Sequence, residues 1–116
     1  MMIKFLFIII LVILVYFSFS KEVEGFINNN AVSYLEENVT ICIKTIYRSK
    51  LLETNLSEIR QRLPNIKIIV ADDSDDNYKI KNKNIISKFE NIEYLDLPYD
   101  SGLSYGRNKA VEKVNT

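Results

Sequence analysis

Two short segments of the chain place polar side chains directly after apolar runs, where they can bind a polar ligand. Lys44 and Thr45 end the first run and offer a cation and a hydroxyl group. Asp72 and Asp73 follow the second run and open the acid-rich stretch 72–76. A carboxylate held by a buried strand can accept hydrogen bonds from a base N–H or a ribose hydroxyl. These residue types therefore suit a nucleoside, although turn-forming acids without a ligand remain an alternative.

A third segment, residues 100–108, reads DSGLSYGRN and combines Gly102 with Arg107 and Asn108. Free backbone N–H groups at the start of a helix favour an anion, and Arg107 can add a charge-assisted contact to a diphosphate. The spacing matches neither the dinucleotide fingerprint nor a P-loop. The chemistry alone leaves two interpretations, a phosphate site or an ordinary glycine turn before a capped helix.

The acid-rich stretch does not match a calcium loop of the EF-hand type. Asp73, Asp75 and Asn77 do stand at alternate positions. However, Tyr78 replaces the required glycine, and Asn84 stands where the closing glutamate belongs. We therefore exclude that site.

The elements that must position these residues alternate between strand and helix patterns. Apolar, β-branched runs predict strands at residues 39–45, 66–71 and 92–97. Apolar residues at helical spacing predict a helix from Ser49, as its cap, to the residue before Pro64. A short helical face is expected at Ile85, Ile86 and Phe89, and a last helix capped by Ser104 is expected to bury Ala110, Val111 and Val114.

This β-α-β-α-β-α order predicts an α/β fold with a parallel sheet and helices on its faces. Ligands of such sheets bind beyond the carboxyl ends of the strands. All three polar segments are therefore expected at one edge of the sheet.

The amino-terminal segment predicts a membrane location. Residues 5–19 are almost entirely apolar, so residues 1–20 are expected to form a signal anchor that spans the membrane once, in the type II orientation. The alternatives are a signal peptide cleaved near Ser20, which gives a secreted protein, and a buried core helix. Residues 21–37 are polar and without a clear period, which indicates a stem or linker. The sequons at Asn38 and Asn55 fit N-glycosylation in a secretory compartment.

Composition narrows the possible functions. Fifteen basic and fifteen acidic residues balance, so no net charge directs the whole chain to nucleic acid. There is no histidine, and Cys42 is the single cysteine, which excludes an internal disulfide and a cysteine zinc site. We expect Cys42 to be a buried apolar thiol.

Taken together, VTICIKT (39–45), IIVADDSDD (68–76) and SGLSYGRNKAV (101–111) resemble the opening of the family 2 glycosyltransferases with the GT-A fold. Within this family, the sequences of the three segments are most similar to those of the animal β-1,4-N-acetylgalactosaminyltransferases. The resemblance implies that residues 38–116 form the amino-terminal, nucleotide-binding half of a GT-A (Rossmann-like) domain. The anchor and stem resemble the type II layout of Golgi transferases.

The resemblance also implies roles for individual residues. Lys44 and Thr45 would line the nucleotide pocket, Asp73 would hydrogen-bond the uracil with support from Asp72, and Arg107 would lie against the nucleotide. The full set expected to bind the nucleotide sugar is Lys44, Thr45, Asp72, Asp73, Gly102, Arg107 and Asn108.

The reaction implied for a complete domain is transfer of a hexosyl or N-acetylhexosaminyl group from a UDP-sugar to a glycan or glycolipid hydroxyl, usually with inversion. The family uses Mn²⁺ or Mg²⁺ held by an Asp-x-Asp motif, and a later carboxylate acts as general base. Both are expected beyond Thr116. This chain alone is therefore predicted to have no catalytic residue, to bind no metal and to be inactive.

Two other functions remain open. A half domain can act as a non-catalytic, membrane-tethered binding protein. The strand and acid pair also resemble the magnesium site of receiver-like regulatory domains, although receivers carry that pair after their first strand.

Overall fold

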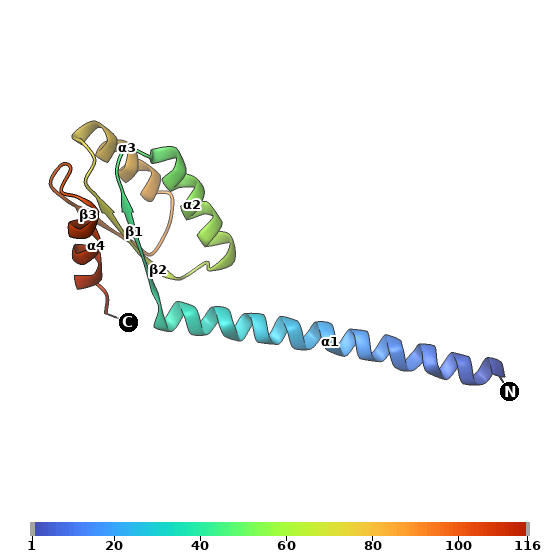
Figure 1. The fold of residues 1–116 in the computed structure, drawn as a ribbon. Helices are drawn as coiled ribbons and strands as arrows, with labels where there is room; N and C mark the ends of the chain where they lie inside the picture. The colour runs from blue at the N-terminus through green and yellow to red at the C-terminus, as the bar shows by residue number, and fades with distance from the viewer. Residues whose placement is uncertain (1, 116) are drawn as a thin grey trace. The chain divides into compact units, whose positions relative to one another are not determined.

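The structure is a computed structural model that describes the backbone of residues 2–115 and the side chains of residues 8–18, 20–21 and 28–115. The elements in chain order are α1 (Met2–Asn38), β1 (Thr40–Thr45), α2 (Ser49–Arg62), β2 (Lys67–Asp72), α3 (Asp76–Ile86), β3 (Ile92–Asp96) and α4 (Leu103–Glu112), as Figure 1 shows. The predicted α/β class is confirmed.

The first of two compact units, residues 1–33, consists of most of α1. Residues 8–17 expose large apolar side chains throughout, with exposed fractions from 42% to 68%. Residue 1 and the side chains of 2–7 and 19 lie outside the described residues. Among the helices that the structure describes, none combines the length and the apolarity needed to cross a membrane. The membrane anchor at residues 1–20 stays a prediction.

The polar segment 21–37, predicted to be a stem or linker, is helical in the structure, and its role as a stem stays a prediction. The structure continues α1 through it, and the backbone N–H of Val39 donates to the carbonyl of Leu35 just beyond the helix end, at 2.9 Å. Helix propagation gains one hydrogen bond for each residue that is fixed, and no proline interrupts the chain before Pro64. A helix that has started in the apolar run can therefore extend through polar residues.

The second unit, residues 34–116, contains a three-stranded sheet in the order β1-β2-β3. All strand pairs are parallel, which confirms the predicted sheet. The register pairs Thr45 with Asp72 and Asp72 with Asp96. The last residues of the three strands therefore meet at one edge.

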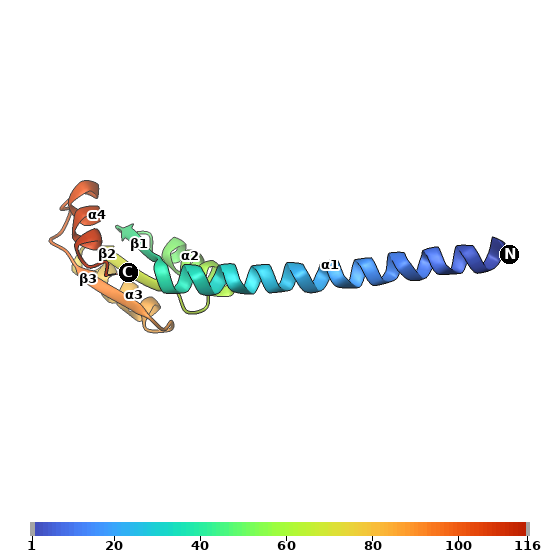
Figure 2. The ribbon, with the colours of Figure 1, turned by 90° about the horizontal axis from the view of Figure 1, so that it is seen from below.

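Helices cover both faces of this sheet. In Figure 1, α2 and α3 lie on one side of the strands and α4 on the other, and Figure 2 again separates α3 from α4. One apolar cluster joins Leu56 of α2 to Ile68 of β2, and a second joins Ala110 of α4 to Ile69. Successive side chains of a strand point to opposite faces, so the central strand β2 is buried on both. The exposed fraction of Ile68, Ile69, Val70 and Ala71 is 0%.

The helix ends differ from the sequence predictions. Ser49 and Ser104 do not cap, because α2 and α4 follow Arg48 and Gly102, and neither of these residues makes a side-chain capping bond. By contrast, α3 is longer than the predicted face and begins after Asp75, whose carboxylate accepts the backbone N–H of Tyr78 at 2.9 Å. The acid-rich stretch thus contains a helix cap.

Two burial predictions also need correction. Val111 is 63% exposed, since a step of one helical residue turns it away from the buried face of Ala110. Val114 lies one turn after Ala110 and packs against the same cluster. Cys42, expected to be buried, is exposed on β1, which is an edge strand with only one neighbour in the sheet.

Candidate functional site

The predicted convergence at the carboxyl edge of the sheet holds for five of the seven residues expected there. The backbone N–H of Asp73 donates to the carbonyl of Thr45 at 3.3 Å. The Lys44 ammonium forms an ion pair with Asp73, and the backbone N–H of Gly102 donates to the other carboxylate oxygen at 3.1 Å. Asp72 and Asp73 are neighbours in sequence and both are fully buried.

The other two residues, Arg107 and Asn108, lie on the exposed surface of α4. No hydrogen bond or ion pair within the described part of the chain joins either side chain to the five residues above. Their predicted contact with a nucleotide stays a prediction.

Asp73 is bonded to the protein through each of its polar atoms. Its carboxylate contacts Lys44 and Gly102, its N–H bonds to Thr45, and its carbonyl accepts the N–H of Asp100 at 2.9 Å. A buried charge is tolerated when it is paired and fully hydrogen-bonded. In this conformation Asp73 therefore holds together the end of β1 and the segments that follow β2 and β3, and its carboxylate is not presented to a ligand.

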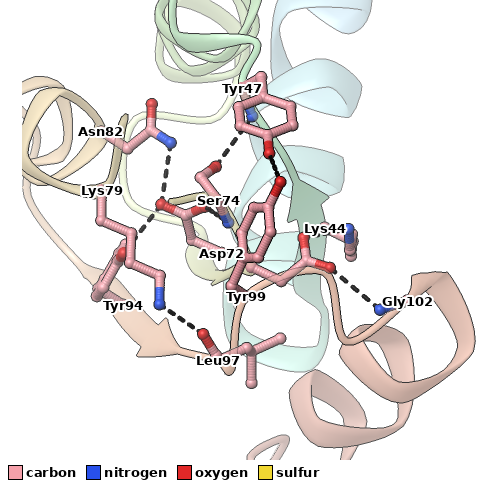
Figure 3. Close-up of polar contacts among 11 residues, drawn as sticks. Lys44, Tyr47, Asp72, Ser74, Lys79, Asn82, Tyr94, Leu97, Tyr99 and Gly102 are labelled. Atoms are coloured by element: carbon pink, nitrogen blue, oxygen red, sulfur yellow. Dashed lines mark hydrogen bonds and ion pairs between the residues drawn. The ribbon is translucent and has the colours of Figure 1, made fainter. Parts of the chain in front are cut away.

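Asp72 is the centre of a second, buried network, shown in Figure 3. One oxygen accepts the backbone N–H of Ser74 at 2.9 Å. The other accepts the amide of Asn82 and the hydroxyl of Tyr94, each at 2.9 Å. Ser49 in turn donates to the Asn82 side-chain oxygen at 2.7 Å. The Asp72 network thus joins β2 to α2, α3 and β3, and the predicted role of Asp72 in supporting a nucleotide contact stays a prediction.

The environment of Tyr94 suppresses ionisation of its phenol. Burial, followed by the hydrogen bond to the Asp72 carboxylate, raises the pKa of Tyr94 above its ordinary value. The neutral phenol is therefore the form that donates to Asp72.

Gly106 positions Lys44, and sequence reasoning did not identify it. A Cβ atom at residue 106 would lie 2.7 Å from Cγ and 3.2 Å from Cε of Lys44. Only glycine allows α4 to pack this closely on the lysine stem. Gly106 follows the predicted Gly102 by about one helical turn. This spacing of two glycines is the sequence feature that could have revealed Gly106.

A cavity of about 330 Å³ lies beside the carboxyl end of β1. It is formed by the end of this strand, the start of α2 and the first residue of α4. The residues that line it are Ile43, Lys44, Thr45, Ile46, Arg48, Leu51, Leu52, Asn55 and Leu103. Lys44 and Thr45 were predicted here, whereas the cation of Arg48 was not. Asn55, a predicted glycosylation acceptor, is exposed and also lines the cavity.

Three tyrosines at the same edge were also missed. Tyr47 follows β1, and its hydroxyl donates to that of Tyr99, which follows β3 (Figure 3). The ring of Tyr78 lies edge-on to Tyr47 with 5.1 Å between centroids. The bond to Tyr99, with a smaller contribution from burial, raises the pKa of Tyr47 to about 12. Each of these tyrosines lies within two residues of one of the three predicted polar segments, and that proximity is the signal that could have revealed them.

The described residues do not provide a divalent-cation site. No group of three or more acidic or cysteine residues in the described range gathers to hold a metal. Asp73-Ser74-Asp75 has Asp-x-Asp spacing, but Asp73 pairs with Lys44 and Asp75 caps α3. We therefore assign no step to a metal, and the prediction that this chain alone binds none is left to experiment.

Comparison with known proteins identifies the family of the region that contains this edge. The profile of Glycosyl transferase family 2 matches residues 40–116. Over 78 residues, 67% of this chain, it is 37% identical to mouse Beta-1,4 N-acetylgalactosaminyltransferase 2 and 36% identical to mouse Beta-1,4 N-acetylgalactosaminyltransferase 1. The human Beta-1,4 N-acetylgalactosaminyltransferase 1 is 33% identical over the same share of the chain.

The matched region spans only 14% of the first of these relatives and 13% of the other two. No solved structure is significantly similar to the chain. The family profile covers all three strands and the edge at which they end. The chain therefore belongs to glycosyl transferase family 2.

Proposed function

We propose that the carboxyl edge of the sheet binds the UDP part of a UDP-sugar, as the donor-binding portion of a glycosyltransferase. The observation that carries this proposal is the cavity in which Lys44 and Thr45 end β1 beside the first residue of α4. Its volume of about 330 Å³ lies at the small end of the range for ligand pockets, about 300 to 1,000 Å³. It can therefore accept part of a nucleotide.

The charges around this cavity support an anionic ligand. Arg48 lines it and is exposed, so its guanidinium can form charge-assisted hydrogen bonds with a phosphate. Leu103 brings the first turn of α4 to the cavity wall, and the free N–H groups of a helix start favour negative charge. The Thr45 hydroxyl adds a neutral partner for a ribose or base.

The names of the relatives guide the choice of sugar. They are N-acetylgalactosaminyltransferases, so we propose an N-acetylhexosamine as the sugar and a glycan or glycolipid hydroxyl as the acceptor in a complete, inverting enzyme. We further propose that this chain binds the donor but does not transfer the sugar. Two observations support this. Asp73 pairs with Lys44 and Asp75 caps α3, and the sequence contains no other Asp-x-Asp segment.

Equilibrium dialysis of the full chain against UDP, with and without Mn²⁺, tests binding. Thr45→Val keeps the side-chain size but removes the hydroxyl, and Arg48→Gln removes the cation. We expect each to weaken UDP binding by about tenfold, which corresponds to about 1.4 kcal/mol. The exposed Lys113→Gln at the other end of α4 is the control. Absence of UDP binding by the wild-type chain would refute the proposal.

A sugar-transfer assay on the same samples tests whether the chain binds the donor without transferring the sugar. UDP binding without sugar transfer supports the donor-binding role, whereas turnover by the 116-residue chain refutes the expected inactivity. Binding of a glycan without UDP would favour the non-catalytic binding protein. Family membership and the position of the acid pair after the second strand argue against the receiver-like alternative.

We also propose that α1 tethers the chain to a membrane of the secretory pathway, in the type II orientation. Residues 8–17 expose apolar side chains around the whole helix, and lipid can surround a helix on every side, whereas a protein partner covers one face. Flotation of the full chain with phosphatidylcholine vesicles tests this. We expect Leu11→Lys with Leu14→Lys to abolish flotation and Val111→Lys, on α4, to leave it unchanged. Cleavage after residue 20 on secretion would favour the secreted alternative.

A further inference from the structure

The hydroxyl bond between Tyr47 and Tyr99 crosses the middle of the sheet edge. Tyr47 follows β1 and Tyr99 follows β3, while β2 lies between these strands. The bonded pair therefore spans the end of β2, from which Asp72 and Asp73 emerge. We propose that Tyr47 and Tyr99 form a strap that closes this edge, and that opening of the strap exposes the Asp73 carboxylate to the nucleotide. This inference rests on the function proposed above.

The segment that carries Tyr99 also encloses Asp73. The backbone N–H of Asp100 bonds to the Asp73 carbonyl at 2.9 Å, and that of Gly102 bonds to its carboxylate at 3.1 Å. Asp73 is fully buried, whereas Tyr99 is 60% exposed. A ligand can reach the Asp73 carboxylate only when this segment moves away from it.

Backbone conformations beside the strap provide positions where the chain can pivot. Tyr47 has φ 61°, Asp100 has φ 51° and Gly102 has φ 96°. The left-handed region is unfavourable for a bulky residue such as Tyr47, and such strain persists only when surrounding contacts hold it. The segment from Asp100 to Gly102 has left-handed backbone at both ends. Rotation about a few backbone torsion angles there can therefore move the segment away from Asp73.

The two sides of the strap are anchored unequally. The Tyr47 backbone N–H donates to the buried Ser74 hydroxyl at 2.9 Å (Figure 3). The Tyr47 ring packs on the ring of Tyr78. Tyr99 contacts Tyr47 through exposed hydroxyl groups, and water competes for a bond in such a position. Tyr99 is therefore the side that opens, and Tyr47 stays in place to receive it.

Tyr99→Phe tests the strap, because it removes the hydroxyl bond and keeps the ring. A ligand that binds only the open state has its affinity reduced by the fraction of molecules that are closed. We expect Tyr99→Phe in the full chain, held in detergent, to bind UDP about two- to fivefold more tightly. Tyr105→Phe, an exposed tyrosine of α4, is the matched control and should match the wild type. Weaker or unchanged UDP binding by Tyr99→Phe would overturn the inference.

Amide hydrogen exchange provides a readout that does not depend on a ligand. Opening the strap frees the N–H groups of Asp100 and Gly102, so both should exchange faster in Tyr99→Phe, whereas Ser74 N–H, bonded to Asp72, should not change. Equal exchange in both proteins would show that no strap exists. If the wild type binds no UDP, the proposed function and the ligand part of this inference fail, and exchange alone decides whether the strap opens.

Discussion

The ammonium group of Lys44 pairs with the carboxylate of Asp73, and this contact joins the end of β1 to the segment that follows β2. The lysine side chain is 10% exposed and the aspartate side chain is 0% exposed. Water therefore compensates little for the loss of either partner, and the pair is a sensitive point of the fold.

Asp73→Asn should strongly destabilise the protein, because it leaves the Lys44 charge buried without its partner. We expect a loss of about 3 to 5 kcal/mol in the free energy of unfolding. Urea unfolding followed by tyrosine fluorescence measures it. The exposed pair of Lys88 and Glu53, 3.5 Å apart, supplies the control, since Lys88→Met should cost less than about 1 kcal/mol. Equal losses in the two variants would contradict the assigned role of Asp73.

Gly106→Ala should destabilise the protein even though alanine favours helix. The new Cβ would lie 2.7 Å from Lys44 Cγ, and overpacking of this kind costs about 1 to 3 kcal/mol. The matched control is Ser104→Ala on the exposed surface of α4. The effect should shrink in the Asp73→Asn background, where the lysine no longer needs a fixed position. A stability at or above that of the wild type would show that Lys44 can move freely.

Tyr94 should make the fold sensitive to alkaline pH. Its folded-state pKa lies above the unfolded value of about 10. Its protonated phenol therefore contributes fully to the free energy of unfolding below pH 10. That contribution is lost as pH rises from about 10 toward the higher folded value. The free energy of unfolding measured between about pH 8 and 11.5 should therefore fall in the wild type and fall less steeply in Tyr94→Phe. Identical slopes would exclude Tyr94 as a cause.

Tyr99→Phe should also change the titration of Tyr47. The Tyr47 pKa of about 12 is caused first by its bond to Tyr99, so removing that hydroxyl should move the value toward the ordinary one, about 10. Absorbance at the phenolate band across the alkaline range measures this shift. Tyr47→Phe identifies which titration belongs to Tyr47. A titration that is unchanged by Tyr99→Phe would mean that the hydroxyl bond does not persist in solution.

The sheet was predictable from sequence because β2 is buried on both faces and must be apolar at successive positions. Its run from Ile68 to Ala71 has that pattern, and the acids after it mark the strand end. The flanking strands and helices followed from their periodicity. The meeting of Thr45, Asp73 and Gly102 then followed from parallel topology.

The remaining features depend on contacts between distant parts of the chain, which local patterns do not encode. Tyr47 and Tyr99 are 52 residues apart, and Ser49 and Asn82 are 33 apart. The helix start at Ser49 was placed well, but its hydroxyl bonds to Asn82 because the third helix lies close enough to compete for it. The burial of Asp73 was missed for the same reason, since its partners come from two other segments.

Because β2 is central, its end is the least adjustable part of the edge. Asp72, Asp73 and Ser74 have no exposed surface, while Tyr99 and Leu103 on the next segment are more than half exposed. Substitutions in the outer segments can therefore alter the surface of this edge without disturbing these three residues. A substitution at Asp72 or Ser74, in contrast, would break buried hydrogen bonds and affect folding first.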